Sequence, residues 1–208
     1  MPELHLPDVS EFQPDVDWAK VVDKNGGAAI IRALYGSSHV DKLWTAGRRA
    51  SAHKHGVKVL GIYHYLTKDE DPLAQAEAFV RTVGTLRHGE FAVLDLEEGL
   101  GDQSARAKPW MDYVDAHLTY PGYRKAWLYS SDSFLGSQLR EFLTNSHRSI
   151  WAADYGARPK ARHVLWQHTD GTHAVPPDWH KQGWPGIGHC DCSVFEGTLM
   201  EFKALVCA

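Results

Sequence analysis

The segment Lys58-Val-Leu-Gly-Ile-Tyr-His-Tyr-Leu66 is an apolar run with strand character, and a second such run, Phe91-Ala-Val-Leu-Asp-Leu-Glu97, follows it in the chain. Between them, Asp71-Pro72 offers a helix start with proline at its tolerated first position, and apolar residues then recur on one helical stripe as far as Val83. A strand, a helix and a second strand in this order predict a β-α-β unit. The chain is therefore placed in the α/β class.

The same alternation extends over the first two thirds of the chain. Strands are predicted at 4–10, 28–34, 58–66, 91–97 and 126–130, and helices at 18–23, 41–52, 71–83, 105–118 and 132–143. Three further strands, at 149–154, 163–169 and 188–193, are separated by connections rich in Pro and Gly, and a short helix at 198–206 closes the chain. Because about eight strands close a barrel whose interior is filled by side chains, we predict a modified TIM-like β/α barrel, (β/α)5β3, with five flanking helices. A single domain over residues 1–208 is expected.

The composition limits the kinds of partner. A formal charge of −4 provides no basic footprint for nucleic acid and no polybasic patch for a membrane surface, so neither is expected. Eight Trp, eight Tyr and seven Phe supply flat faces that suit sugar rings. The start of the chain lacks the basic and apolar regions of an export signal, and no stretch approaches the ~20 apolar residues of a membrane span. We expect a monomer that acts on an uncharged or mixed-charge partner.

The cysteines and histidines follow no metal-binding or disulfide pattern. Cys190, Cys192 and Cys207 are odd in number, and the first two are too close for an ordinary bridge within one strand. The thirteen histidines are scattered, with no H-E-x-x-H and no paired C-x-x-C. Neither a metal site nor a cofactor is expected.

Asp95 and Glu97 are the residues that most strongly indicate chemistry. Because side chains alternate along a strand, both carboxylates point to the same side, with Cα atoms roughly 6.5–7 Å apart. At that separation one carboxylate can raise the pKa of the other, which separates the roles of acid and base. Taken alone, the pair also fits a strand end that frays into a solvated acidic turn.

The barrel brings more polar side chains to the same place, because catalytic groups of such barrels gather where the C-terminal ends of the strands converge. Acidic, aromatic and amide residues occupy these ends: Asp8, Tyr63, Tyr65, Asp95, Glu97, Tyr129, Trp151, Asp154, Tyr155, Gln167 and Asp191. No Gly-rich phosphate-binding motif accompanies them. An acidic and aromatic mouth of this kind favours glycoside hydrolysis. His64 points the opposite way from its tyrosine neighbours and is expected in the core.

The chain resembles the family 25 glycoside hydrolases, the Chalaropsis-type lysozymes that cleave peptidoglycan. Its two most specific motifs are Gly61-Ile-Tyr-His-Tyr65, which is similar to the family's G-x-Y-H-[FY] strand, and Leu94-Asp-Leu-Glu97, which is similar to its D-x-E strand. Further motifs follow in the family's order: Asp8-Val-Ser10 with Gln13 and Asp17-Trp18, Ile31-Arg-Ala33 with Gly36 and Asp41, Trp151-Ala152 with Tyr155, Leu165-Trp-Gln167, and Asp191 with Phe195 and Gly197. The resemblance implies a barrel variant of eight strands and five helices.

The resemblance also implies a β-1,4-N-acetylmuramidase whose partner is the glycan strand of peptidoglycan. It makes Glu97 the general acid that protonates the leaving glycosidic oxygen, and makes Asp95 the group that assists the substrate's N-acetyl group in a retaining reaction. Direct attack by Asp95, or inversion through an activated water, stays open because the carboxyl separation decides between them. Asp8 and Asp191 match two further acids that tune charge and hold substrate or water. The expected sugar contacts are Tyr63, Tyr65, Tyr129, Trp151, Tyr155 and Gln167.

One stretch departs from the family pattern. In Cys190-Asp191-Cys192-Ser193, cysteine replaces the apolar residue that commonly precedes the last Asp, and Cys-Ser replaces the Leu-Asn that follows it. Alternation puts both cysteines on the face opposite Asp191, where they can act as small apolar fillers. Serine in place of asparagine could remove a hydrogen bond that positions Asp191. Pairing with Arg32 would give Asp8 a structural role instead.

Three other functions compete with this interpretation. The barrel could bind cell-wall glycan without cutting it, although the presence of both Asp95 and Glu97 argues against this. It could cleave an amide bond of the wall, but the expected outward direction of Cys190 and Cys192 disfavours a thiol mechanism. It could also hydrolyse another N-acetylated polymer such as chitin. A muramidase without an export signal fits a phage endolysin or its catalytic domain, released to the cell wall through a separate pore; a mature secreted enzyme or an excised domain fits as well.

Overall fold

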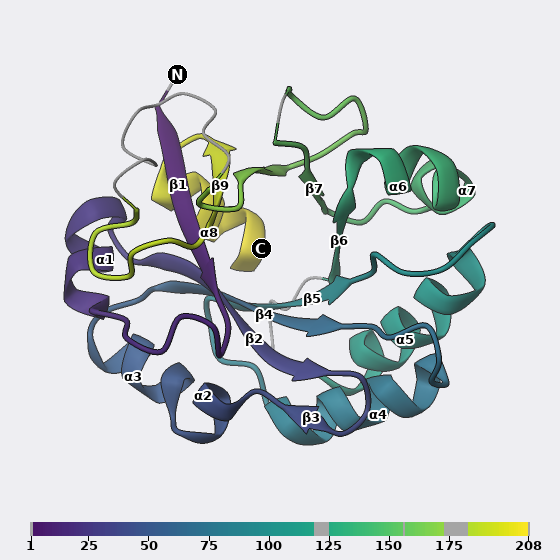
Figure 1. Ribbon diagram of the computed structural model, residues 1–208, viewed down its shortest axis with the longest axis horizontal. Helices are drawn as coiled ribbons and strands as arrows, with labels where there is room; N and C mark the ends of the chain where they lie inside the picture. Colours follow the sequence, from purple (N-terminus) through teal and green to yellow (C-terminus); the bar gives the residue numbers. More distant parts are fainter. Residues whose placement is uncertain (1, 119–124, 156, 173–182, 208) are drawn as a thin grey trace.

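The structure is a computed structural model that describes residues 2–118, 125–155, 157–172 and 183–207 (Figure 1). Its strands are β1 (Glu3–Val9), β2 (Ala28–Tyr35), β3 (His39–Val40), β4 (Val59–Tyr65), β5 (Glu90–Asp95), β6 (Trp127–Ser131), β7 (Ile150–Ala153), β8 (Leu165–Thr169) and β9 (Asp191–Glu196). Its helices are α1 (Trp18–Asn25), α2 (Lys42–Thr45), α3 (Arg48–Lys54), α4 (Pro72–Val83), α5 (Ser104–His117), α6 (Asp132–Gln138), α7 (Arg140–Asn145) and α8 (Leu199–Cys207).

The strands form one sheet that closes on itself through β1. The sheet order is β1-β9-β8-β7-β6-β5-β4-β2-β3, and β1 also pairs with β2. β9 runs antiparallel to both of its neighbours, whereas the other barrel strands run parallel to one another. β3 pairs only with β2 and stands outside the ring of eight. The predicted eight-stranded α/β barrel is confirmed.

Capping side chains begin the first helices where the sequence indicated. The carboxylates of Asp17, Asp41 and Asp71 accept hydrogen bonds from backbone N–H groups in the first turns of α1, α2 and α4. α1 ends at Gly26, whose φ of 80° lies in the left-handed region that glycine adopts without strain. These signals fix where the chain turns back toward the barrel wall.

The helices are more divided than predicted. The helix expected at 41–52 splits into α2 and α3, because Gly47 adopts a φ of 92° that no continuous helix contains. The helix expected at 132–143 splits at Leu139 into α6 and α7. The two-residue strand β3 was not predicted. No helix in the described part of the chain is both long and apolar enough to cross a membrane.

Two strand ends at the barrel mouth differ from the prediction. β5 ends at Asp95, so Glu97 lies just beyond the strand, although the Leu96 backbone N–H still donates to the Tyr129 carbonyl at 3.1 Å. β9 begins at Asp191 rather than at Gly188, because Gly188 belongs to a turn in which it pairs with Trp184. Since β9 is antiparallel, its first residue lies at the mouth, not its last.

Apolar side chains form one layer on each side of the barrel wall. The outer layer lies under the helices and includes Phe79 and Trp110. The inner layer includes Phe91 and Trp127, and Phe202 of α8 lies against both, with ring centroids at 6.0 and 5.9 Å. Because Phe91 and Trp127 stand at the starts of their strands, α8 closes the end of the barrel opposite the mouth.

Gly61 in β4 supplies the space that Phe91 occupies. A Cβ placed at Gly61 would lie 2.9 Å from the Phe91 ring and 3.0 Å from Ile30. Gly61→Ala is therefore expected to lower the free energy of unfolding by about 1–3 kcal/mol, as overpacking does. In Gly136→Ala, in α6, the added Cβ meets no atom within 4 Å, so the free energy of unfolding should rise by about 0.5–1 kcal/mol. Urea denaturation of both variants tests this; equal midpoints would contradict the packing argument.

Candidate active site

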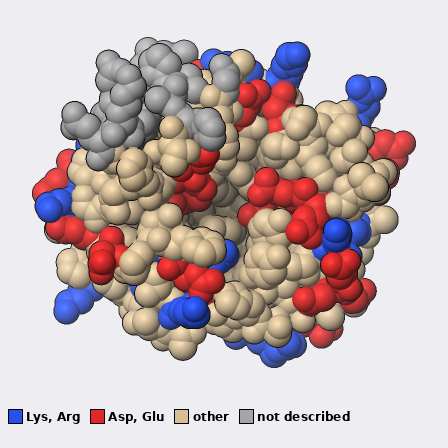
Figure 2. Space-filling view, in the orientation of Figure 1, with Lys and Arg blue, Asp and Glu red and all other residues tan. Residues whose placement is uncertain are grey.

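A cavity of about 280 Å³ opens at the mouth of the barrel. It is lined by Asp8, Ser10, Phe12, Gln13, Arg32, Tyr63, Tyr65, Asp95, Glu97, Tyr129, Trp151, Gln167 and Asp191. All of the predicted site residues except Tyr155 are in this set. Figure 2 shows a hollow near the centre of the molecular face, with acidic side chains beside it.

A second cavity, of about 510 Å³, adjoins the first. It shares Glu97 and Tyr129 with the mouth cavity and is also lined by Tyr155, Asp154 and Lys160. Glu97 therefore stands between two hollows. This arrangement would let an extended chain lie across the carboxyl group with a part on either side.

Asp95 and Glu97 form a hydrogen-bonded carboxyl pair with unequal surroundings. Asp95 is buried at the end of β5, and burial together with the nearby charge of Glu97 raises its pKa well above the ordinary value; Arg32 acts in the opposite direction. Glu97 is exposed but stands in a crowded mouth, where loss of hydration and the charge of Glu98 raise its pKa, while the hydrogen bond from Asp95 lowers it. Both pKa values are raised, and Glu97 is the member of the pair that a ligand can reach.

Asp8 and Asp191 form a second carboxyl pair across the β1–β9 seam, where they are direct register partners. Burial and the charge of Asp191 raise the pKa of Asp8 well above its ordinary value. Burial, with the charges of Asp170 and Glu97, raises the pKa of Asp191 to about 6, although the hydrogen bond from Asp8 opposes this. The mouth thus holds two pairs of acids, each joined by a hydrogen bond.

Gln167 connects the acids to the aromatic wall. Its Oε1 accepts hydrogen bonds from the hydroxyls of Tyr129 at 2.6 Å and Tyr155 at 3.0 Å, and its Nε2 donates to Asp8 Oδ2 at 3.0 Å. These three contacts fix which way the amide points. The structure therefore places Gln167, predicted to contact substrate, where it also orients other side chains of the mouth.

Trp151 is held in the wall from behind. Its ring is buried and lies 4.3 Å from that of Tyr129, and its Nε1 donates to Ser193 Oγ at 2.8 Å. Ser193 was expected to weaken the support of Asp191; instead it points into the barrel and anchors the indole. Cys190 and Cys192 lie in the outer apolar layer, as predicted.

Arg32 and Phe12 were missed as mouth residues. Arg32 does not pair with Asp8; its guanidinium donates to Glu11 Oε1 at 3.0 Å and Asp41 Oδ2 at 3.1 Å, and it lies over the Phe12 ring at 5.4 Å. Phe12 is 76% exposed at the rim. An arginine within the otherwise apolar run 28–34 was a usable signal, because a charge in a buried strand needs partners.

The remaining aromatic residues of the mouth divide by position. Tyr63 and Tyr65 line the cavity, and the Tyr65 ring stacks on Tyr35 at 4.7 Å. His64 is buried in the core, as predicted: Trp110 Nε1 donates to its Nδ1 at 2.7 Å, and burial lowers its pKa to about 3. This neutral, fully packed imidazole does not line the mouth cavity.

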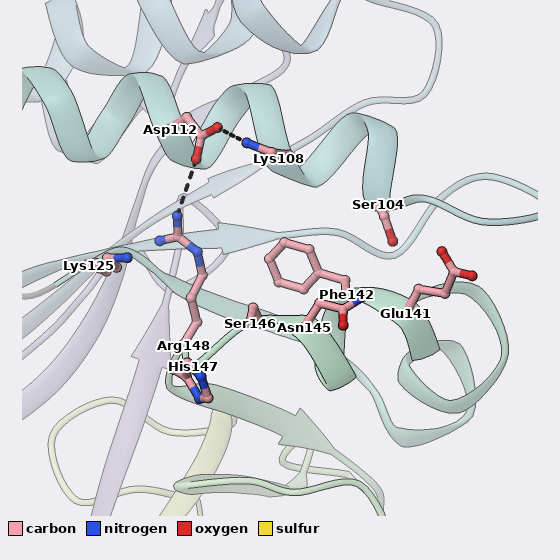
Figure 3. Close-up of a pocket in the computed structure, with 10 residues that line it drawn as sticks. All are labelled: Ser104, Lys108, Asp112, Lys125, Glu141, Phe142, Asn145, Ser146, His147 and Arg148. Atoms are coloured by element: carbon pink, nitrogen blue, oxygen red, sulfur yellow. Dashed lines mark hydrogen bonds and ion pairs between the residues drawn. The ribbon is translucent and has the colours of Figure 1, made fainter.

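A separate cavity of about 370 Å³ lies outside the barrel between α5 and α7 (Figure 3). Three of its charged side chains form ion pairs: Asp112 pairs with Lys108 and lies 3.7 Å from Arg148, which also contacts Asp115 at 2.9 Å. None of the predicted site residues lines it. The mouth is therefore the better candidate for catalysis.

Comparisons with known proteins agree on one family. Residues 7–175 match the family model described as "Glycosyl hydrolases family 25". The chain is 29% identical over 219 aligned residues to the "Uncharacterized protein YegX" of Escherichia coli (strain K12), covering 98% of this chain and 73% of that protein.

Solved structures have the same fold. The bacterial lysozyme from Streptomyces coelicolor aligns with a TM-score of 0.78 at 21% identity, covering 98% of this chain and 96% of that one. The catalytic domain of endolysin ply40, from bacteriophage P40 of Listeria monocytogenes, aligns with a TM-score of 0.74 at 22% identity and covers 98% of both chains.

The raised pKa of Asp191 makes folding depend on pH. The unfolded chain ionises this carboxyl near its ordinary 3.8, whereas the folded chain does so near 6, so its contribution to stability is present below about pH 4 and is lost as pH rises to about 6. The Asp191→Asn variant has no carboxyl at this position, so it does not lose this stability as pH rises. Relative to wild type, its free energy of unfolding should increase by about 2–3 kcal/mol between about pH 4 and pH 6.

Chemical denaturation at a series of pH values measures the difference. Asp69→Asn, which changes an exposed carboxylate that lines neither cavity of the mouth, is the matched control and should follow wild type throughout. A constant difference between Asp191→Asn and wild type across pH would contradict the raised pKa.

Proposed function

Because this chain belongs to family 25 of the glycosyl hydrolases, we propose that it hydrolyses the β-1,4 bond between N-acetylmuramic acid and N-acetylglucosamine in peptidoglycan. The observation that carries the proposal is the Asp95–Glu97 pair, in which a buried carboxyl and an exposed one, both with raised pKa values, stand side by side at the barrel mouth. The fold that the chain has in common with a bacterial lysozyme and an endolysin catalytic domain supports the same activity. The enzyme acts on glycan strands at the bacterial cell wall.

Glu97 is the general acid in this proposal. It is the accessible member of its pair, and it stands between two cavities that can hold the sugars on either side of the scissile bond. Its raised pKa favours the protonated form, which a general acid needs. The proton passes to the glycosidic oxygen as the bond between that oxygen and the anomeric carbon breaks.

Asp95 assists the substrate's own N-acetyl group. In this proposal a proton passes from Asp95 to Glu97 and leaves Asp95 as a carboxylate, so a single transfer prepares both groups. The acetamide oxygen then attacks the anomeric carbon, and the Asp95 carboxylate stabilises the positive charge that develops on the acetamide. Water, deprotonated by Glu97, opens the cyclic intermediate with net retention.

Asp8 and Asp191 set the charge on the opposite side of the mouth. The raised pKa of both groups reduces the negative charge that they carry, which suits a site that must stabilise an oxocarbenium-like transition state without losing the proton of Glu97. Tyr63, Tyr65, Tyr129 and Tyr155 provide the aromatic and hydroxyl contacts for the sugars.

Glu97→Gln tests the central assignment. The amide keeps the shape of the side chain but carries no proton to donate, so the rate of peptidoglycan solubilisation should fall by about 10²–10⁴-fold. Mass spectrometry of borohydride-reduced fragments reports the bond that wild type cleaves. Reduced N-acetylmuramic acid ends are expected from wild type and should be absent with the variant.

Glu77→Gln, on the exposed surface of α4, changes the same charge away from the mouth and should retain wild-type activity. Reduced N-acetylglucosamine ends from wild type would mean that the other glycosidic bond, or another N-acetylated glycan, is the substrate. Binding of glycan without release of fragments from several wall types would instead establish a non-catalytic binding barrel.

The exposed ring of Phe12 is expected to contact a sugar at the rim. Phe12→Ala should raise KM for soluble glycan fragments by about 2–10-fold and leave kcat nearly unchanged, because an aromatic contact of about 0.5–1.5 kcal/mol remote from the reacting atoms acts mainly on binding. Leu100→Ala removes a comparably exposed apolar side chain that does not line the cavity and is the control. An equal KM for both variants would remove Phe12 from the site.

A further inference from the structure

Two imidazoles and one thiol from three strands meet at the seam of the barrel. The ligating atoms of His5 in β1, His168 in β8 and Cys192 in β9 all lie within 4.8 Å of one another. These strands are neighbours, with β9 in the middle. His168 and Cys192 are 3% and 1% exposed, and His5 is partly buried, so the cluster is enclosed rather than a chance grouping on the surface.

Strand alternation places the cluster on the outer side of the wall. Gln167, Asp191 and Ser193 face the lumen, so the residues next to them in sequence face outward. His168 stands where the β8–β9 register shifts, since Gln167 pairs with Ser193 but Thr169 pairs with Cys192. A bulge of this kind redirects a side chain, and here it accompanies the approach of His168 to the other two residues.

The donor set suits a transition metal. Two nitrogen donors and a sulfur donor bind Zn²⁺, and also Cu²⁺, but they do not suit Mg²⁺ or Ca²⁺, which prefer oxygen. Ligands at about 2.0–2.3 Å from a tetrahedral ion are about 3.3–3.8 Å apart, so small side-chain rotations would bring these atoms into place. The three residues leave the fourth ligand position for a solvent molecule.

The surroundings of His5 provide a second indication. Its Nε2 lies 3.5 Å from a carboxylate oxygen of Glu3. Because Nε2 faces that carboxylate, Nδ1 is the nitrogen that would bind a metal. Histidines that bind metal commonly have their other ring nitrogen paired with a carboxylate, which fixes the orientation of the ring. Glu3 and His5 belong to the same strand, so this contact is set by β1 itself.

We propose that His5, His168 and Cys192 form a zinc site that ties together the three strands at the closure of the barrel. Such a site would be structural, because it lies behind the wall from the catalytic acids. It would act on the mouth through Gln167, Asp191 and Ser193, whose chain neighbours it holds. It could not be expected from the sequence, because its ligands are far apart in the chain and follow no known spacing.

Titration of the metal-free full-length protein with Co²⁺ and then Zn²⁺ tests the proposal. Wild type should bind one equivalent of Co²⁺ with a thiolate-to-cobalt charge-transfer band, which Zn²⁺ should abolish by displacement. Zinc at about a hundredfold excess over its Kd should raise Tm by about 5–10 °C. Cys190→Ser, which changes the neighbouring buried cysteine outside the cluster, should keep both responses.

Cys192→Ser should lose the charge-transfer band, and His5→Gln should lose the rise in Tm. Because Cys192 is fully buried and its variant could unfold, His5→Gln at a partly exposed position provides an independent test, with circular dichroism as the check on folding. Absence of a charge-transfer band in wild type, or an unchanged band in a folded Cys192→Ser variant, would overturn the site. Glycan hydrolysis enters neither measurement, so failure here leaves the proposed function untouched.

Discussion

Closure of the sheet through β1 is the constraint on which the rest of the molecule depends. β1 is hydrogen-bonded on one side to the parallel strand β2 and on the other to the antiparallel strand β9, so the first and last strands of the chain meet. That seam sets Asp8 opposite Asp191 and brings the Gln167 amide of the next strand to Asp8. A shift of one residue along the seam would turn one of the acids to the outer face.

The mouth concentrates acids where burial makes their charge unfavourable. The fold tolerates this because each buried carboxyl has an acidic neighbour that accepts a hydrogen bond from it, and because Arg32 offsets part of the negative charge near Asp95. Arg32 is itself held by ion pairs with Glu11 and Asp41. The electrostatic arrangement that suits acid catalysis therefore lowers the stability of the fold. Apolar packing at the end of the barrel opposite the mouth offsets this cost.

Periodicity in the sequence predicted the barrel and the side of the wall that each mouth residue faces, because alternation is a local property. It could not predict where Gly47 and Leu139 divide helices, since helical spacing continues through both positions. It also could not identify the partner of Arg32 or the anchor of Trp151, because the residues concerned are distant in sequence. Asp95 and Glu97 were recognisable because two acids ending an apolar strand are a local pattern. Their raised pKa values depend on burial by residues that are distant in sequence.

The last strands carry polar groups on both faces. In β8 and β9 the lumen side bears Gln167, Asp191 and Ser193, whereas the outer side bears His168 and Cys192. In the described part of the chain no helix lies between β7 and β8 or between β8 and β9 in sequence. Polar contacts on both faces would support these strands. The acids of the seam would then depend on side chains behind the wall as well as on those beside them.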